Sequence, residues 1–293
     1  MTVEAAFDLP MAGSGLWRQA WRRLGRNKAA VIGLVVLATM ALLGILAPVL
    51  SPHPMDLTYM DRVSAGPDWP NHFYFGNDGV GRDLFARTLY GARVSLMVGL
   101  LASLVSLVIG VGYGAVSGFV GGAVDGVMMR IVDVLYALPY MFFVILLMVF
   151  FGRNVVLMFI AIGAVEWLDM ARIVRGQTLS LKHREFVEAA RAFGVRPLAI
   201  VGRHIVPNLL GPVVVFLTLT VPRVILLESF LSFLGLGVQE PMTSWGVLIA
   251  DGARTMESAP LALILPASFL AATLYALNFL GDGLRDALDP QDR

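Results

Sequence analysis

Long apolar runs alternate with short polar segments along most of this chain. Six of them are long enough to cross a bilayer, because about 20 apolar residues in a helix span the roughly 30 Å hydrocarbon layer. They occupy residues 29–50, 93–118, 127–151, 154–174, 210–234 and 261–281. The pattern therefore predicts an all-α membrane protein with six transmembrane helices.

The polar segment 172–208 differs from the other connections because it is both basic and patterned. It contains seven arginine and lysine residues. Its apolar positions recur at spacings of three and four, as on one face of a short helix; they are Phe186, Ala189, Ala190 and Phe193. On another face, Glu188 and Arg191 lie three residues apart. The segment is therefore predicted to form a short helix and not an unstructured loop.

The end of this short helix is also marked in the sequence. Gly194 suits the left-handed conformation that closes a helix, and Pro197 suits the first turn of a second helix that runs to about His204. Pro207 precedes the next apolar run. Two short helices joined at a glycine predict a compact unit that a partner can grip, although an interfacial helix pair with a purely structural role has the same pattern.

Charge predicts how the chain is oriented. In membrane proteins, the loops on the cytoplasmic side carry more arginine and lysine than the loops on the outer side. Five such residues precede the first apolar run of this chain: Arg18, Arg22, Arg23, Arg26 and Lys28. The predicted organisation is a cytoplasmic tail 1–28, a first helix 29–50, an outer loop 51–92, a five-helix core 93–281 with an inner loop 176–209, and a cytoplasmic tail 282–293. The turn at 152–153 is very short, so the third and fourth runs form either two helices or one re-entrant unit.

The outer loop 51–92 is predicted to hold a short helix. Asn77 or Asp78 would cap it, and Asp83 and Arg87 would pair within it as residues four apart. Its apolar residues are predicted to lie on the outer membrane interface; they are Leu84, Phe85 and Leu89.

Three glycines spaced four apart mark the second apolar run. Gly110, Gly114 and Gly118 would let another helix approach closely. The same stretch loosely matches a dinucleotide-binding glycine pattern, but that pattern needs a preceding strand. Helix packing is the predicted role.

Several ionisable residues fall within or near the apolar runs. Their burial in lipid is costly, so they are predicted to face protein or water; they are Asp133, Glu166, Asp169, Arg223 and Glu228. Asp169 and Arg172 are predicted to pair. Arg223 and Glu228 lie five apart and should point to different sides, so each either lines a wet pathway or pairs with a neighbouring helix or subunit.

Composition favours a lipid-embedded chain, and the motifs argue against an enzyme. Of the 293 residues, 57% are hydrophobic and 15% are charged, whereas soluble domains average about 25% charged residues. The chain has no cysteine, and none of its four histidines has a neighbour at metal-ligand spacing. It also lacks a phosphate-binding loop of the Gly-x4-Gly-Lys-Ser/Thr type. We expect no catalytic, metal or cofactor site on this chain.

The basic segment resembles the cytoplasmic loop of permease subunits in binding-protein-dependent ABC importers. That motif is Glu-Ala-Ala, three residues, Gly, nine residues and then Ile-x-Leu-Pro, and it falls on Glu188, Ala189, Ala190, Gly194 and Pro207. His204 and Val206 replace the Ile and Leu of the motif. This departure is similar to the peptide and nickel branch of the family.

Further segments resemble the C-type permeases of oligopeptide importers. They are Phe75–Leu96, Trp167–Lys182, Ser229–Gly237, the Ser244-Trp245-Gly246 turn and the C-terminal GDGLRDALDPQDR. The resemblance implies a type I importer permease fold in a bacterial inner membrane, with loop 51–92 in the periplasm. It also implies that loop 176–209 is a coupling helix that contacts an ATPase through Phe186, Glu188, Ala189, Ala190, Arg191, Gly194 and Pro207.

The implied partners are a second homologous permease, two ATPase subunits that hold ATP and Mg²⁺, and a periplasmic or lipid-anchored peptide-binding protein. Arg223 and Glu228 are the candidates to line the translocation pathway. Two alternatives stay open: the same machinery with dipeptides, glutathione, murein peptides or nickel as cargo, and a membrane channel or scaffold without ATP coupling.

Overall fold

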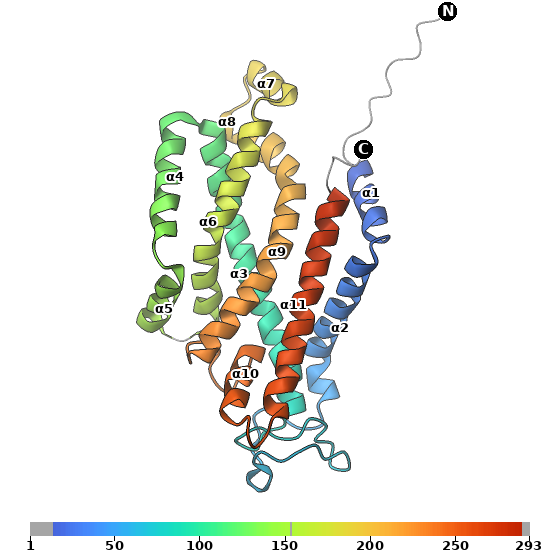
Figure 1. Cartoon of the computed structure of the whole chain (residues 1–293). Helices are drawn as coiled ribbons and strands as arrows, with labels where there is room; N and C mark the ends of the chain where they lie inside the picture. The colour runs from blue at the N-terminus through green and yellow to red at the C-terminus, as the bar shows by residue number, and fades with distance from the viewer. Residues whose placement is uncertain (1–13, 153, 289–293) are drawn as a thin grey trace, which may run out of the picture.

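The chain folds into a helical bundle (Figure 1). The computed structural model describes residues 14–152 and 154–288, so the outer parts of both predicted tails and Arg153 lie outside the described residues. The elements are α1 (Ser14–Leu24), α2 (Lys28–Leu50), η1 (Met60–Arg62), α3 (Leu84–Val120), α4 (Gly122–Ala137), α5 (Tyr140–Phe151), α6 (Val155–Leu181), α7 (Glu185–Ala192), α8 (Pro197–Ile200), η2 (Val201–Ile205), α9 (Val206–Phe233), α10 (Trp245–Arg254) and α11 (Leu261–Leu288). The all-α prediction is confirmed.

The number of helices that can cross a membrane is close to the prediction. Four described helices are long and apolar enough: α2, α3, the continuous run Pro197–Phe233, and α11. The bent pair α4–α5 makes a fifth if it is one span. Helix α6 has 27 residues, but its apolar stretch carries charged residues at Glu166, Asp169 and Arg172. The predicted count of six is thus approximate.

The third predicted helix, 127–151, is broken. Helices α4 and α5 meet at a bend of 81°. Pro139 has no N–H to continue the helix and pushes the preceding residue into extended backbone. Leu138 indeed has φ −75° and ψ 141°. The prediction of one continuous helix was wrong because this proline dominates the apolar pattern around it.

The outer loop is shorter than predicted, because α3 already begins at Leu84. Asp83 is its N-cap and accepts a hydrogen bond from the Phe85 N–H at 2.9 Å. The predicted short helix capped by Asn77 or Asp78 was therefore wrong. Leu84 and Leu89 are each 1% exposed and lie inside the protein instead of on the membrane interface.

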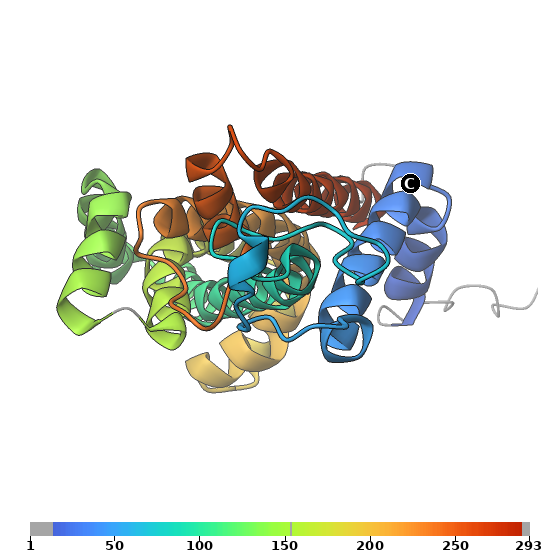
Figure 2. The same ribbon diagram turned by 90° about the horizontal axis from the view of Figure 1, so that it is seen from below.

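The bundle has two distinct ends (Figure 1). Helices α1 and α7 and the last turns of α11 lie at one end, and loop 51–83 and α10 lie at the other. In the view along the bundle, α3 is near the centre, α4 and α5 are at one edge and α1 and α2 at the opposite edge (Figure 2). The basic segment and α1 thus share one end, as the sequence predicted.

The three spaced glycines of α3 face α6. A Cβ on Gly118 would lie 2.8 Å from the Arg175 carbonyl oxygen, and one on Gly110 would lie 2.9 Å from that of Trp167. Gly114 approaches the Ala171 carbonyl oxygen still more closely. The predicted packing role is confirmed, and the partner helix is α6.

We expect Gly114→Val to destabilise the chain by about 1–3 kcal/mol, the usual cost of overpacking. The added side chain would collide with backbone atoms of α6, which cannot rotate away. Gly112→Val is the matched control, because a Cβ at Gly112 meets nothing within 4 Å. Thermal unfolding of the two variants in detergent measures the difference; equal stability would refute the packing assignment.

Candidate functional site

Helix α7 ends as the sequence predicts. Gly194 has φ +72°, a left-handed conformation that glycine adopts without strain. Its N–H donates to the Arg191 carbonyl at 2.9 Å, and the Val195 N–H donates to the Ala190 carbonyl at 3.1 Å. This pair of bonds is the Schellman closure. The turn between α7 and α8 is therefore fixed by backbone hydrogen bonds.

One face of α7 is packed against its own bundle. Val187 is fully buried and Ala190 is 7% exposed. They join an apolar cluster with residues of α6 and of the run that follows α7, including Met170, Val174, Ile200, Val201, Ile205 and Leu209. The Arg191 guanidinium lies over the Phe119 ring at the end of α3, 4.9 Å from its centroid. Helix α7 is thus fixed to α3, α6 and α8.

The helix after α7 does not stop near His204. Helices α8 and α9 are joined by the π-helical turn Val201–Ile205 into one run, Pro197–Phe233. Pro207 cannot donate a backbone hydrogen bond at this point, and π-helical turns accommodate such gaps in the helical ladder. The predicted break before the fifth span was wrong. A displacement of α8 would therefore pass directly into α9.

The rest of the α7 surface, with the Phe193 that follows it, is exposed in this chain. Of the predicted apolar stripe, only Ala190 is buried, while Phe186 is 41% and Phe193 is 87% exposed. Leu198, which follows shortly afterwards on α8, is 76% exposed. Glu188 and Ala189 are also exposed. Apolar side chains of this size at a bundle end suit contact with another protein.

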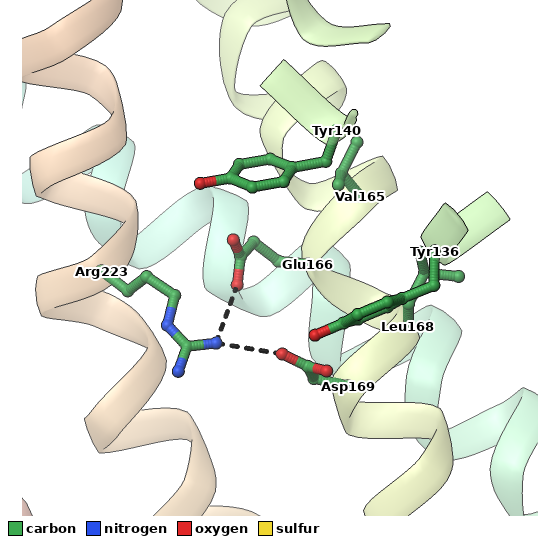
Figure 3. Close-up of a pocket in the computed structure, with 7 residues that line it drawn as sticks. All are labelled: Tyr136, Tyr140, Val165, Glu166, Leu168, Asp169 and Arg223. Carbon is green, nitrogen blue, oxygen red and sulfur yellow. Dashed lines mark hydrogen bonds and ion pairs between the residues drawn. The ribbon is translucent and has the colours of Figure 1, made fainter. Parts of the chain in front are cut away.

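A pocket of about 380 Å³ opens between α6, α9 and the α4–α5 pair (Figure 3). Its lining residues are Tyr136, Tyr140, Val165, Glu166, Leu168, Asp169 and Arg223. Arg223 Nη1 lies 3.0 Å from Asp169 Oδ2 and 3.9 Å from Glu166 Oε2. The Arg223 side chain is nevertheless 58% exposed, so the pocket presents charges of both signs to its opening.

The predicted pair of Asp169 and Arg172 does not form. Asp169 pairs with Arg223 on α9, while Arg172 donates to Asp133 of α4 at 2.9 Å. The Arg172 guanidinium also lies 4.3 Å from the centroid of the Tyr136 ring. Neighbouring helices supply closer partners than the same helix does, which a spacing rule for one helix cannot foresee.

Glu228 is fully buried, so in this conformation it does not line an accessible surface. Its carboxylate accepts hydrogen bonds from Ser232 and Ser244 at 2.7 Å each and from Ser95 at 3.4 Å. Ser95 also accepts the Trp245 N–H at 3.1 Å. Glu228 thus ties α3, α9 and the start of α10 together. As predicted, it does not contact Arg223.

We expect Glu228→Leu to lower the stability of the chain by about 1–3 kcal/mol, because it leaves three buried hydroxyls without their acceptor. Glu228→Gln keeps an acceptor oxygen and should lose less than half as much. Glu257→Leu, at an exposed loop position, serves as control. Thermal unfolding in detergent decides the point; equal loss with Gln and Leu would show that shape and not hydrogen bonding matters.

An ion network at the other end holds the outer loop. Arg82 donates to Asp78 at 2.9 Å and to Glu240 at 2.6 Å. Arg87 lies 3.5 Å from Asp78 and 3.9 Å from Asp251 of α10. The predicted pair of Arg87 with Asp83 was therefore wrong. The hydrogen bond from Arg82 lowers the pKa of the Glu240 carboxyl. Sequence spacing missed this network because its members lie up to 173 residues apart, the difference between positions 78 and 251.

The described residues include no group of three or more His, Asp or Glu side chains placed to hold a metal. The candidate sites are the exposed surface of α7 and the pocket around Arg223. The first suits contact with a protein, and the second suits a polar solute.

Two family models match this chain. The model described as "Binding-protein-dependent transport system inner membrane component" covers residues 106–291, and that of the "N-terminal TM domain of oligopeptide transport permease C" covers residues 15–67. Together they account for most of the sequence.

Curated relatives match over almost the whole length. The chain is 59% identical to the oligopeptide transport system permease protein OppC of Escherichia coli over 285 residues, which are 97% of this chain and 94% of that protein. It is 47% identical to the dipeptide transport system permease protein DppC of Bacillus subtilis over 280 residues, 94% of this chain and 86% of the other.

The fold also matches a solved structure. A chain from inward-facing conformations of the MetNI methionine ABC transporter aligns with a TM-score of 0.54 at 19% identity. The alignment covers 69% of this chain and 96% of the other. At this identity the match concerns the fold alone.

Proposed function

Because this chain belongs to the family of binding-protein-dependent transport system inner membrane components, we propose that it is a permease subunit of an ATP-driven oligopeptide importer. The observation that carries this proposal is the 59% identity to an oligopeptide permease over 97% of the chain. The protein is a multi-pass component of the inner membrane, and its activity is transport. ATP and Mg²⁺ would bind to partner ATPase subunits.

Dipeptides are the second candidate cargo, since a dipeptide permease is 47% identical. The binding protein that delivers the cargo would set this choice. Glutathione, murein peptides and nickel stay within the same proposal, because the permease provides a path and only weak selection.

The basic segment would couple transport to ATP. We assign the exposed face of α7 to a groove on an ATPase subunit, with contacts from Phe186, Glu188, Ala189 and Arg191. Closure of the ATPase pair would then displace α7. Since α7 is packed on α6 and α8, and α8 continues into α9, the displacement would tilt membrane helices as one body.

The required coupling is large. Changing the ratio of inward to outward conformations from 99:1 to 1:99 takes about 5.5 kcal/mol of differential binding. A flexible joint would absorb part of the displacement. The hydrogen-bonded turn at Gly194 and the continuous run Pro197–Phe233 would transmit the displacement.

The pocket around Arg223 would line the translocation path together with the partner permease. Its carboxylates, Glu166 and Asp169, suit the amino terminus of a peptide, and the Arg223 guanidinium suits its carboxylate. Glu228 would contribute indirectly, because its hydrogen bonds hold the start of α10 against α9 and α3.

The end with α1, α7 and the last turns of α11 is assigned to the cytoplasm because the basic residues collect there. Loop 51–83 and α10 would then face the periplasm and receive the peptide-binding protein. A second homologous permease would complete the path.

Cysteine crosslinking tests the proposal cleanly, since the chain has no cysteine of its own. We expect Arg191→Cys, in the assembled importer, to crosslink to an ATPase subunit and to be protected from an impermeant thiol reagent added outside. Arg254→Cys on α10 is the matched control and should react from outside. Labelling of position 191 from outside, or a purified complex without ATPases, would overturn the assignment.

A further inference from the structure

Helix α1 is a basic amphipathic helix that sits over an apolar slot. Ala20 and Leu24 are buried against α11, at 6% and 5% exposure. Arg18 and Arg22 lie one turn apart on an exposed face. Trp21 is 65% exposed, and in helical projection it lies between the apolar and basic faces. Helices with this pattern are found at the boundary between lipid and water, where their cations meet anionic headgroups.

The slot beneath α1 is lined entirely by apolar side chains from four helices and has a volume of about 260 Å³. They are Ala20, Trp21, Leu24, Leu34, Val214, Leu280, Leu284 and Leu288. The leucines of α11 extend from Leu280 to Leu288, or about 12 Å of helix. An elongated hydrocarbon chain fits this shape better than a polar solute does.

Four cations lie close in the sequence to the α1 and α2 residues that line the slot: two in α1, one in the turn after it and one at the start of α2. Among the described residues, Arg18, Arg22, Arg26 and Lys28 have no acidic partner within ion-pair distance. Like charges four residues apart on a helix repel each other, and a bound anion relieves that repulsion. The feature calls for a ligand with an anionic head and an apolar tail.

We propose that α1 and the slot hold an anionic phospholipid of the adjacent leaflet, with its phosphate on Arg18 and Arg22 and one acyl chain along Leu280–Leu288. Charge complementarity selects this occupant over a zwitterionic lipid. The site would anchor α1 against α2, α9 and α11. It does not depend on the cargo or on ATP coupling.

The test uses the purified chain in detergent with added phosphatidylglycerol or phosphatidylcholine, and bound lipid is counted by native mass spectrometry. We expect phosphatidylglycerol to be retained preferentially and in a salt-sensitive manner. Arg18→Gln with Arg22→Gln should weaken its apparent affinity about 30-fold, because each basic residue near an anionic surface contributes roughly fivefold. Arg254→Gln, at the opposite end, should change nothing.

Two further variants separate the head from the tail. Arg18→Lys with Arg22→Lys should keep most of the binding, since the charge is kept, and Leu284→Trp should block the slot with all cations in place. Size-exclusion profiles confirm that each variant is folded. Equal retention of both lipids would overturn the proposal. So would a crosslink from Trp21→Cys to the partner permease in a complex that retains no lipid.

Discussion

Replacing Gly194 with valine will reduce peptide uptake and substrate-stimulated ATPase activity to less than about one tenth, while the chain still inserts and assembles. Gly194 holds φ +72°, where an L residue pays about 1–2 kcal/mol and a β-branched one more. A Cβ at this position meets nothing within 4 Å. The damage is therefore confined to the backbone turn between α7 and α8 and does not arise from a collision in the core.

The local nature of this change is what makes it informative. If valine reopens the Schellman turn, α7 loses its fixed angle to the run Pro197–Phe233, and in the proposed coupling an ATPase would no longer tilt α9. Uptake of radiolabelled peptide and ATPase activity in proteoliposomes measure the two sides of that coupling. Uptake should fall below about one tenth, because even a loss of 1.4 kcal/mol from the coupling energy is tenfold in an equilibrium.

Gly176→Val supplies the control. Gly176 is exposed on α6 near the same end, and a Cβ there also meets nothing within 4 Å. Its backbone is helical, so valine costs only its modest helix propensity. Glu188→Lys gives an independent route, because Glu188 is exposed and its reversal changes a contact surface without changing the turn. Normal uptake by both Gly194→Val and Glu188→Lys would remove the coupling proposal.

The features that the sequence predicted well are those set by local chemistry. Gly194 closes α7 because only a few residues tolerate its backbone angle, and the glycines of α3 meet α6 because a small side chain permits close approach. Both features can be read from glycine alone: from its position at the end of a helix in the first case, and from its spacing of four residues in the second. The apolar runs likewise predicted the bundle, since a bilayer leaves few alternatives to a helix.

The features that it missed depend on the contacts between helices. Glu228 has hydroxyl partners on α3 and before α10, and nothing in its own segment indicates them. The spacing of Asp169 and Arg172 suggested a pair, but Asp133 and Arg223 are closer once α4 and α9 pack beside α6. Pro139 was visible in the sequence, and its effect on an otherwise continuous apolar run was underestimated.

The second large effect is expected at the pocket. Arg223→Glu will stop peptide uptake, because it places a third carboxylate beside Glu166 and Asp169 and removes the positive charge. Two causes would give this result. In one, the Arg223–Asp169 contact at 3.0 Å is a structural ion pair between α9 and α6. In the other, the half-exposed guanidinium serves the passing peptide.

A charge swap separates these causes. The double variant Asp169→Arg with Arg223→Asp restores an ion pair across the same gap, so folding, assembly and basal ATPase activity should return to near the original level. The positive charge then sits on α6 and not on α9. If Arg223 binds the carboxylate of a peptide, uptake should stay at least about tenfold low, the usual cost of losing one charged hydrogen bond.

Arg172→Gln is the control for the loss of an arginine from α6 near the pocket. Arg172 pairs with Asp133 and is not among the residues that line the pocket, so its neutralisation should leave uptake within about twofold, as for other exposed ion pairs. Full uptake by the swapped double variant would mean that the ion pair alone matters, and the path would then have to be sought elsewhere. Low uptake with intact ATPase activity would mean that the charges of this pair act on what passes through the pocket, since the swap preserves the link between α6 and α9 but moves both the guanidinium and the Asp169 carboxylate.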